Sequence, residues 1–286
     1  MTRLIKITIV VLSTLFAIST QAKAASENVN ADPLPACSSS LSGAVIIPNF
    51  SNTVRQCGAT PSSYSITVYE MGVCTSHPYG ASKGSSTFDA STCEVVYTDA
   101  TATSTDIAGS IGTASSLPGT STLPPPGTYG FPYILFKNEF KISGTFTSAN
   151  GTVTTSDASN ALKNSGTPVV ITESLDDFAG GAGTCKSGYI GATVTGATID
   201  GFIVDANKER EVTGAANCNA HKTHLAGVLT LTAPFTITPQ TYGLNFKFNL
   251  TGQGVQFIDT TGTANGIPNE FSSAPFSGTF EVLNQD

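Results

Sequence analysis

The residues best suited to chemistry lie close together in the second half of the chain. Cys218, His221 and His224 form a Cys-x-x-His-x-x-His pattern, and thiolate and imidazole are the ligands that zinc and copper prefer. His221 and His224 are the candidate metal ligands, because a Cys218 held in a disulfide has no thiolate to offer, but we favour a loop without metal. An exposed polar loop is the favoured interpretation, since Lys222 adds positive charge there and residues three apart on a strand point to opposite faces.

A serine motif lies in the first half, where residues 80–84 read Gly-Ala-Ser-Lys-Gly. A Gly-x-Ser-x-Gly sequence presents a nucleophilic serine only where a strand turns sharply into a helix. No helical pattern follows Ser82. We therefore interpret the motif as a chance match in a loop rich in glycine and serine, with His77 as another residue of that loop.

Acidic residues offer a third kind of chemistry. Two facing carboxyl groups can hydrolyse a glycosidic bond, and acids clustered in loops also bind calcium. Residues 205–209 lack the glycine and the distal glutamate of a standard calcium loop. We expect mostly solvated surface charge and keep calcium as an alternative. The candidate acids are Asp176, Asp177, Asp205, Glu209, Glu211 and Asp259.

Six cysteines favour a disulfide framework, because an even count in an exported chain indicates pairing. Short intervening loops make sequential pairing the simplest arrangement. No Cys-x-x-Cys pair is present, so we expect structural rather than redox roles. The predicted pairs are Cys37 with Cys57, Cys74 with Cys93, and Cys185 with Cys218.

The chain begins with the features of an export signal. Arg3 and Lys6 precede an apolar run at residues 7–18, and Ala22-Lys23-Ala24 fits a cleavage site. We predict removal of residues 1–24 and export to the periplasm, the cell surface or the extracellular medium. A lipoprotein box at residues 34–37 is the alternative, although a polar stretch separates it from the apolar run. Since spanning a bilayer takes about 20 apolar residues, we expect no transmembrane segment.

The composition favours strands over helices. Charged residues make up only 12% of the chain, whereas the exposed faces of helices are normally built from Glu, Lys and Arg. The net charge of −7 makes nucleic acid an unsuitable partner.

Alternating apolar and polar residues predict the main strands. Residues 134–146, 225–237 and 242–251 alternate with a period of two, which places the apolar side chains on one face and leaves the other face in water. Weaker patterns bring the expectation to about eleven strands, separated by turns rather than helical crossovers. The sequence therefore predicts an all-β protein, an antiparallel β-sandwich of the immunoglobulin-like or prealbumin-like class.

A polar, turn-forming stretch at residues 148–167 suggests a domain boundary near Asn160. We predict two packed units with long polar loops, although one large domain also fits the length. The predicted parts are a signal peptide at 1–24, a flexible N-terminal arm at 25–40, a first β-sandwich domain at 41–160 and a second at 161–286.

Two short motifs give a family resemblance. A strand-like Tyr64-Ser65-Ile66-Thr67-Val68 precedes a loop, and Pro126-Gly127-Thr128-Tyr129 forms a turn that enters a long strand. In this order of signals, residues 60–146 resemble secreted prealbumin-like or carbohydrate-binding-like β-sandwich modules of bacterial surface proteins. The resemblance implies a fold class and carries no functional residue.

We expect a non-catalytic protein, because the three histidines and few charged residues form no convincing nucleophile and base pair. Our first hypothesis is a structural or adhesive component of the cell surface, in which a terminal strand at 276–283 or the arm at 25–36 pairs with another subunit or an envelope partner. The alternatives are a metal-binding periplasmic module and a glycan-binding module. Aromatic platforms for a glycan would come from Tyr64, Tyr69, Tyr79, Tyr97, Tyr129 and Tyr133.

Overall fold

A computed structural model describes most of the chain between residues 54 and 285 and short segments before it. The described residues are 8–10, 24–25, 28–30, 34, 36–37, 48–51, 54–148, 151–156, 162–175, 189–194, 196–210, 221–259, 267–274 and 276–285. Within these ranges the protein is built from β-strands with two short 3-10 turns, η1 (Ala90–Thr92) and η2 (Ala108–Ser110). None of the described residues belongs to a helix that is long and apolar enough to cross a membrane.

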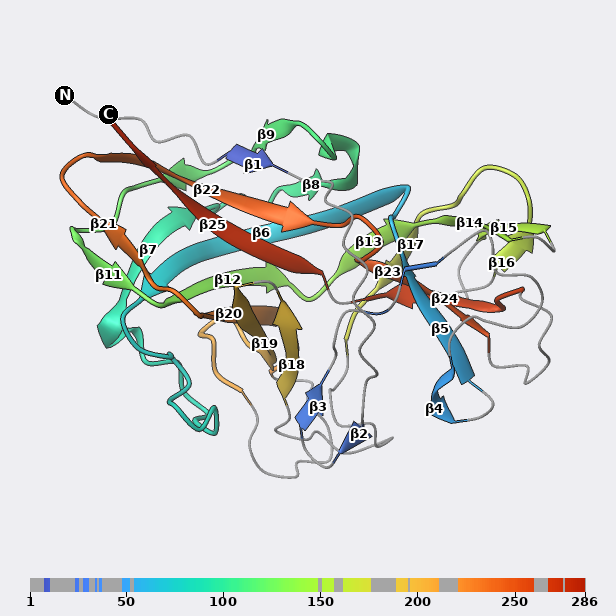
Figure 1. Cartoon of the computed structure of the whole chain (residues 1–286), viewed down its shortest axis with the longest axis horizontal. Coiled ribbons are helices and arrows are strands. Elements are labelled where there is room, and N and C mark those ends of the chain that lie inside the picture. Colours follow the sequence, from blue (N-terminus) through green and yellow to red (C-terminus); the bar gives the residue numbers. More distant parts are fainter. Residues whose placement is uncertain are drawn as a thin grey trace.

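The largest sheet crosses the middle of the molecule (Figure 1). Its central strands β6, β12, β20, β19 and β18 pair antiparallel in that order. Strands from both sides of residue 160 therefore share one sheet, through the pairing of β12 with β20. The strands of this sheet are β2 (Ala24–Ala25), β3 (Asn28–Asn30), β6 (Ser63–Cys74), β7 (Cys93–Thr98), β8 (Ser104–Asp106), β10 (Thr120–Ser121), β12 (Phe131–Lys137), β13 (Phe140–Ser143), β17 (Ile171–Glu173), β18 (Tyr189–Val194), β19 (Ala197–Val204) and β20 (His224–Leu231).

Smaller sheets complete the fold, and one of them covers a face of the central sheet. Its order is β25, β22, β1 and β9, and β22 and β25 run side by side across β6 in Figure 1. The remaining strands are β1 (Thr8–Val10), β4 (Pro48–Ser51), β5 (Val54–Ala59), β9 (Ala114–Ser116), β11 (Gly127–Tyr129), β14 (Thr145–Ser148), β15 (Gly151–Thr155), β16 (Leu162–Asn164), β21 (Phe235–Ile237), β22 (Thr241–Asn249), β23 (Val255–Asp259), β24 (Glu270–Ser273) and β25 (Ser277–Asn284).

The main core lies between these two layers. Ile134 and Phe136 of β12 are buried in the same cluster as Phe246 and Phe248 of β22, and the Phe136 and Phe248 rings lie 6.4 Å apart. Alternation along β22 buries Leu244, Phe246 and Phe248 as the period-two pattern predicts. The all-β antiparallel sandwich expected from the sequence is confirmed.

The strongest predicted strand differs from expectation in two ways. Residues 134–146 do not form one strand. They are divided among β12, β13 and β14, and the first interruption lies at Asn138. The Asn138 side-chain amide donates to the Leu175 and Lys222 carbonyls. The second face of β12 is also not solvated, because Tyr133 and Leu135 are buried in a separate cluster. An alternating pattern identifies one buried face but does not reveal a loop that covers the other.

Two of the three predicted disulfides are present, Cys37–Cys57 and Cys74–Cys93. Cys185 and Cys218 lie outside the described residues, so their pairing stays a prediction. Part of the predicted N-terminal arm is structured, since β3 pairs parallel with β18. Residues 8–10 of the predicted signal peptide form β1, which lies between β22 and β9.

Candidate functional site

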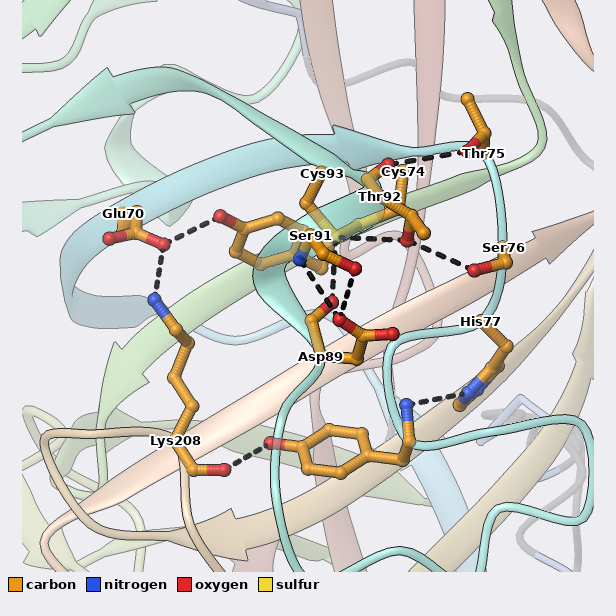
Figure 2. Close-up of a disulfide and its surroundings, with 12 residues drawn as sticks. Glu70, Cys74, Thr75, Ser76, His77, Asp89, Ser91, Thr92, Cys93 and Lys208 are labelled. Carbon is orange, nitrogen blue, oxygen red and sulfur yellow. Dashed lines mark hydrogen bonds and ion pairs between the residues drawn. A yellow bond between two sulfur atoms is a disulfide. The ribbon is translucent and has the colours of Figure 1, made fainter.

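The second face of the central sheet is covered by the segment between Cys74 and Cys93, which we call the disulfide loop (residues 75–92). Cys74 ends β6 and Cys93 begins β7, where the two residues are register partners. The disulfide therefore closes the neck of the loop (Figure 2), and the Thr75 N–H donates to the Thr92 carbonyl just beyond it at 2.9 Å.

Aromatic side chains fix the disulfide loop on the sheet. Tyr79 and Phe88 from the loop are buried against Phe202 of β19 and Tyr133 of β12, with ring centroids 4.3 Å apart for Tyr79 and Phe202 and 4.9 Å for Phe88 and Tyr133. Gly72 of β6 makes room for this packing, because a Cβ there would collide with the Tyr133 ring. The loop thus forms a small second core of its own.

The return of the loop to β7 is organised by Asp89. Its carboxylate accepts hydrogen bonds from the Ser91 backbone N–H at 3.0 Å and from the Ser91 hydroxyl at 2.6 Å. These bonds stabilise the charged form, so they lower the pKa of Asp89. Asp89 caps the 3-10 turn η1, which delivers the chain to Cys93.

A buried polar cluster lies beneath the loop, and we call it the Asp200 cluster (His77, Lys83 and Asp200). Asp200 stands on β19 and is 1% exposed. Its Oδ1 lies 2.8 Å from Lys83 Nζ, and its Oδ2 lies 3.6 Å from His77 Nε2. The loop therefore supplies two basic side chains and the sheet supplies the carboxylate. These contacts connect the disulfide loop to the sheet.

The orientation of the His77 ring follows from its second nitrogen. His77 Nδ1 accepts from the Tyr79 backbone N–H at 3.2 Å, as the dashed line at His77 in Figure 2 shows. A neutral imidazole that accepts at Nδ1 carries its proton on Nε2, and Nε2 faces Asp200. Phe131 and Phe202 stand edge-on to the ring at 5.9 and 6.1 Å, so the contact lies among apolar groups.

A second pair lies nearby, and we call it the Glu70 cluster (Glu70, Tyr133 and Lys208). Glu70 Oε1 lies 2.7 Å from Lys208 Nζ and accepts from the Tyr133 hydroxyl at 2.6 Å (Figure 2). Burial, and then Glu70, raise the pKa of Tyr133. Both charged side chains remain partly in water, with Lys208 17% and Glu70 20% exposed.

Arg210 joins the two clusters. Its Nη1 donates to the Lys83 carbonyl at 2.6 Å, and its guanidinium lies 4.8 Å from the centroid of the Phe202 ring. Burial lowers the pKa of Arg210, because a charged group loses hydration among apolar side chains. Since the Tyr79 hydroxyl also donates to the Lys208 carbonyl at 2.9 Å, the disulfide loop and the turn at residues 205–210 hold each other in place.

The predicted serine motif lies within this loop, but its serine is not the residue that makes contact. Ser82 is exposed, and the neighbouring Lys83 reaches the buried carboxylate. In the described residues that follow, only η1 interrupts the loop before β7, so the strand-to-helix turn that this motif requires is missing. The interpretation as a loop agrees with this geometry.

The predicted metal ligands His221 and His224 make separate contacts. His221 Nδ1 lies 3.5 Å from Asp205 Oδ2. The His224 ring packs 4.6 Å from the Tyr69 ring, and its Nδ1 lies 2.8 Å from the Thr223 hydroxyl. Burial lowers the pKa of His224. Among the described residues, no three His, Cys, Asp or Glu side chains form a group that could hold a metal ion, and Cys218 lies outside them.

The other candidates lie in a turn, in the core or outside the described residues. Asp205 Oδ1 accepts from the Asn207 and Glu209 N–H groups and so closes a turn, and Asp259 is buried on β23. Asp176, Asp177 and Glu211 lie outside the described residues. The tyrosines expected as glycan platforms are largely inaccessible: Tyr69 is half-buried and the buried ones are Tyr64, Tyr79, Tyr97, Tyr129 and Tyr133.

Asp200 is the residue that the sequence analysis missed, and the sequence contains a signal for it. In a strand at 198–204, Asp200 is in phase with Phe202 and Val204, which places a carboxylate on an apolar face. A buried carboxylate needs a cationic or hydrogen-bonding partner. The partner, Lys83, is far away in sequence, so only the fold identifies it.

Comparison with known proteins adds no relative: no family model matches the chain, and no curated protein or solved structure matches it either.

Proposed function

We propose that this chain is an exported, non-catalytic structural or adhesive component of the cell surface that assembles by strand addition at β25. The observation that carries the proposal is the position of β25. It pairs with β22 over residues 277–284, and it forms the edge of its sheet among the described strands. An edge strand offers a row of backbone donors and acceptors to a strand of another chain.

The side chains of β25 suit such a contact. Phe280 and Val282 face the core, and Thr279 and Glu281 are exposed. Phe280 packs 4.8 Å from Phe246, so the strand is anchored and does not need the partner in order to fold. The free edge of β25 is therefore held in place by the core beneath it.

Signal-peptide removal would add a second open edge. β1 occupies the side of β22 opposite β25, and its residues belong to the predicted signal peptide. Cleavage after Ala24 separates β1 from the chain and leaves the backbone of β22 and β9 to be paired by another strand. A strand of a second copy is the occupant we propose, because loss of β1 leaves unpaired backbone donors and acceptors along β22 and β9.

The character of the disulfide loop supports a durable scaffold rather than an open reaction site. Its two basic side chains, His77 and Lys83, contact Asp200 of the sheet, and disulfides are typical of proteins that work in oxidising compartments. These contacts favour a role that depends on stability.

Light scattering across a concentration series, on protein isolated from the cells that export it, tests the proposal. We expect the mass to rise with concentration. Thr279→Lys should suppress the rise, since a charge on an edge strand opposes strand addition. Thr198→Lys is the matched control, because Thr198 is exposed on β19, which is paired on both sides. A protein that stays monomeric throughout, or an equal effect of both variants, would contradict the proposal.

A further inference from the structure

The disulfide loop brings the Lys83 amine to a buried carboxyl group. Lys83 adopts a left-handed backbone conformation with φ of 57°, which is unfavourable for a residue with a Cβ. Its N–H donates to the Gly80 carbonyl at 2.9 Å, and its own carbonyl is held by Arg210. The backbone is therefore fixed in a conformation that directs the side chain toward Asp200.

The Asp200 cluster has the parts that amide formation needs. Nζ is a nucleophile when it gives up a proton, and it lies 2.8 Å from Oδ1 of the carboxyl group. On the other side, His77 Nε2 faces Oδ2 at 3.6 Å. Within the described part of the chain neither of these two atoms has a hydrogen-bond partner. A donor aimed at a carboxyl oxygen stabilises the negative charge that develops there during attack at the carbon.

We propose that Lys83 and Asp200 join in an intramolecular amide bond, which makes the Asp200 cluster a self-modification site. The ammonium of Lys83 transfers one proton to Oδ1, and Nζ attacks Cγ. Negative charge develops on Oδ2 and is stabilised by the His77 Nε2–H. The Cγ–Oδ1 bond then breaks and Oδ1 leaves as water with a second proton from the nitrogen. One amide and one water form from the ammonium and the carboxylate, and no other reactant is required.

Burial supplies the driving force. Removing the Asp200 carboxylate from water carries a desolvation cost that its attraction to Lys83, whose side chain is 25% exposed, only partly offsets, and a neutral amide avoids that cost. The folded chain also holds the two groups in contact, which replaces an encounter in solution with a local step. Asp200 is 1% exposed, so little water reaches the product to reverse the reaction.

The Glu70 cluster provides an internal comparison. Lys208 Nζ and Glu70 Oε1 are equally close, at 2.7 Å, but Glu70 is partly solvated and the Tyr133 hydroxyl donates to the same oxygen that Lys208 contacts. No described donor takes the place of His77 at its other oxygen. We expect this pair to remain an ion pair.

Intact-mass spectrometry of the exported protein after disulfide reduction and thiol alkylation tests the proposal. The expected result is a mass lower than that of the processed sequence by one water. Trypsin should then fail to cut after Lys83, and residues 56–137 should appear joined to residues 187–208, since Lys83 and Asp200 lie in these tryptic segments. A full mass with normal cleavage after Lys83 would overturn the proposal.

Two conservative variants assign the bond. Lys83→Arg keeps the positive charge but removes the amine, so the missing water should be restored. Lys208→Arg is the matched control and should leave the water deficit unchanged. His77→Ala should slow formation, seen as a larger uncrosslinked fraction in freshly made protein. A deficit that persists in Lys83→Arg would place the lost water elsewhere and contradict the assignment, and the measurement on the unaltered protein stands even if a variant does not fold.

Discussion

The Asp200 cluster and the Glu70 cluster place the same two functional groups at the same distance in different surroundings. Lys83 and Asp200 meet at 2.8 Å and Lys208 and Glu70 at 2.7 Å. Asp200 is almost completely buried and Glu70 is one-fifth exposed. Water screens an exposed pair but not a buried one. Since Lys83 is 25% exposed and Lys208 17% exposed, the main difference lies in the carboxylates. We therefore expect burial of the carboxylate, rather than the length of the contact, to decide how much the stability of the protein depends on each lysine.

The largest loss of stability is expected when Asp200, the buried carboxylate, is removed. Asp200→Ala leaves Lys83 and His77 facing an apolar site, and breaking a buried pair in this way costs about 3–5 kcal/mol. We expect the free energy of unfolding to fall by that amount in denaturant titrations followed by circular dichroism. A loss no larger than that of Glu70→Ala would remove the distinction between the clusters.

Opening the disulfide loop should affect the Asp200 cluster through the backbone. Replacing Cys74 and Cys93 together by alanine is expected to lower the free energy of unfolding by about 2–4 kcal/mol. Hydrogen exchange should become faster in loop amides such as Lys83, because the neck of the loop is no longer closed. Exchange that stays unchanged in the loop would indicate that the aromatic packing alone holds it.

A smaller loss is expected at the Glu70 cluster. Glu70→Gln keeps an oxygen that accepts from the Tyr133 hydroxyl and removes only the charge opposite Lys208. Because this pair is partly solvated, the expected loss is about 1 kcal/mol or less. Chemical denaturation at low and high salt checks it, since screening should reduce the difference between the two proteins.

The smallest change in stability is expected from the titration of His224, which lies outside both clusters. Burial lowers the pKa of His224 below its ordinary value of 6.5, so the unfolded chain binds a proton more readily than the folded one. The contribution of His224 to the free energy of unfolding should therefore be fully present above pH 6.5 and decrease as the pH falls below that value. Replacing His224 by glutamine should flatten this part of the stability profile, and an unchanged profile would show that another group titrates.

The sequence was sufficient for the features that depend on local pattern. Alternation identified β22, and loop length gave the Cys37–Cys57 and Cys74–Cys93 pairs. It was insufficient where distant segments meet. The face of β12 that carries Leu135 was expected to be solvated, but a loop that begins at Thr75 covers it, and no periodicity in β12 can encode that cover.

The candidate site could be predicted only in part for the same reason. Asp200 is recognisable as a carboxylate in phase with apolar residues, but the loop that carries Lys83 has no regular pattern from which its path could be derived. The serine motif, interpreted as a chance match, contains Lys83, the residue that makes the contact, beside the exposed Ser82.

A pair of double-mutant cycles tests most directly whether the Asp200 cluster, and not the Glu70 cluster, couples the disulfide loop to the sheet. One cycle combines Lys83→Met with Asp200→Ala, and the other combines Lys208→Met with Glu70→Ala. We predict a coupling energy for Lys83 and Asp200 at or above the upper end of the range of about 0.5–3 kcal/mol seen for contacting residues, because the proposed amide adds to the ion pair, and a value near the lower end for Lys208 and Glu70. Equal couplings, or a larger one for Lys208 and Glu70, would contradict it.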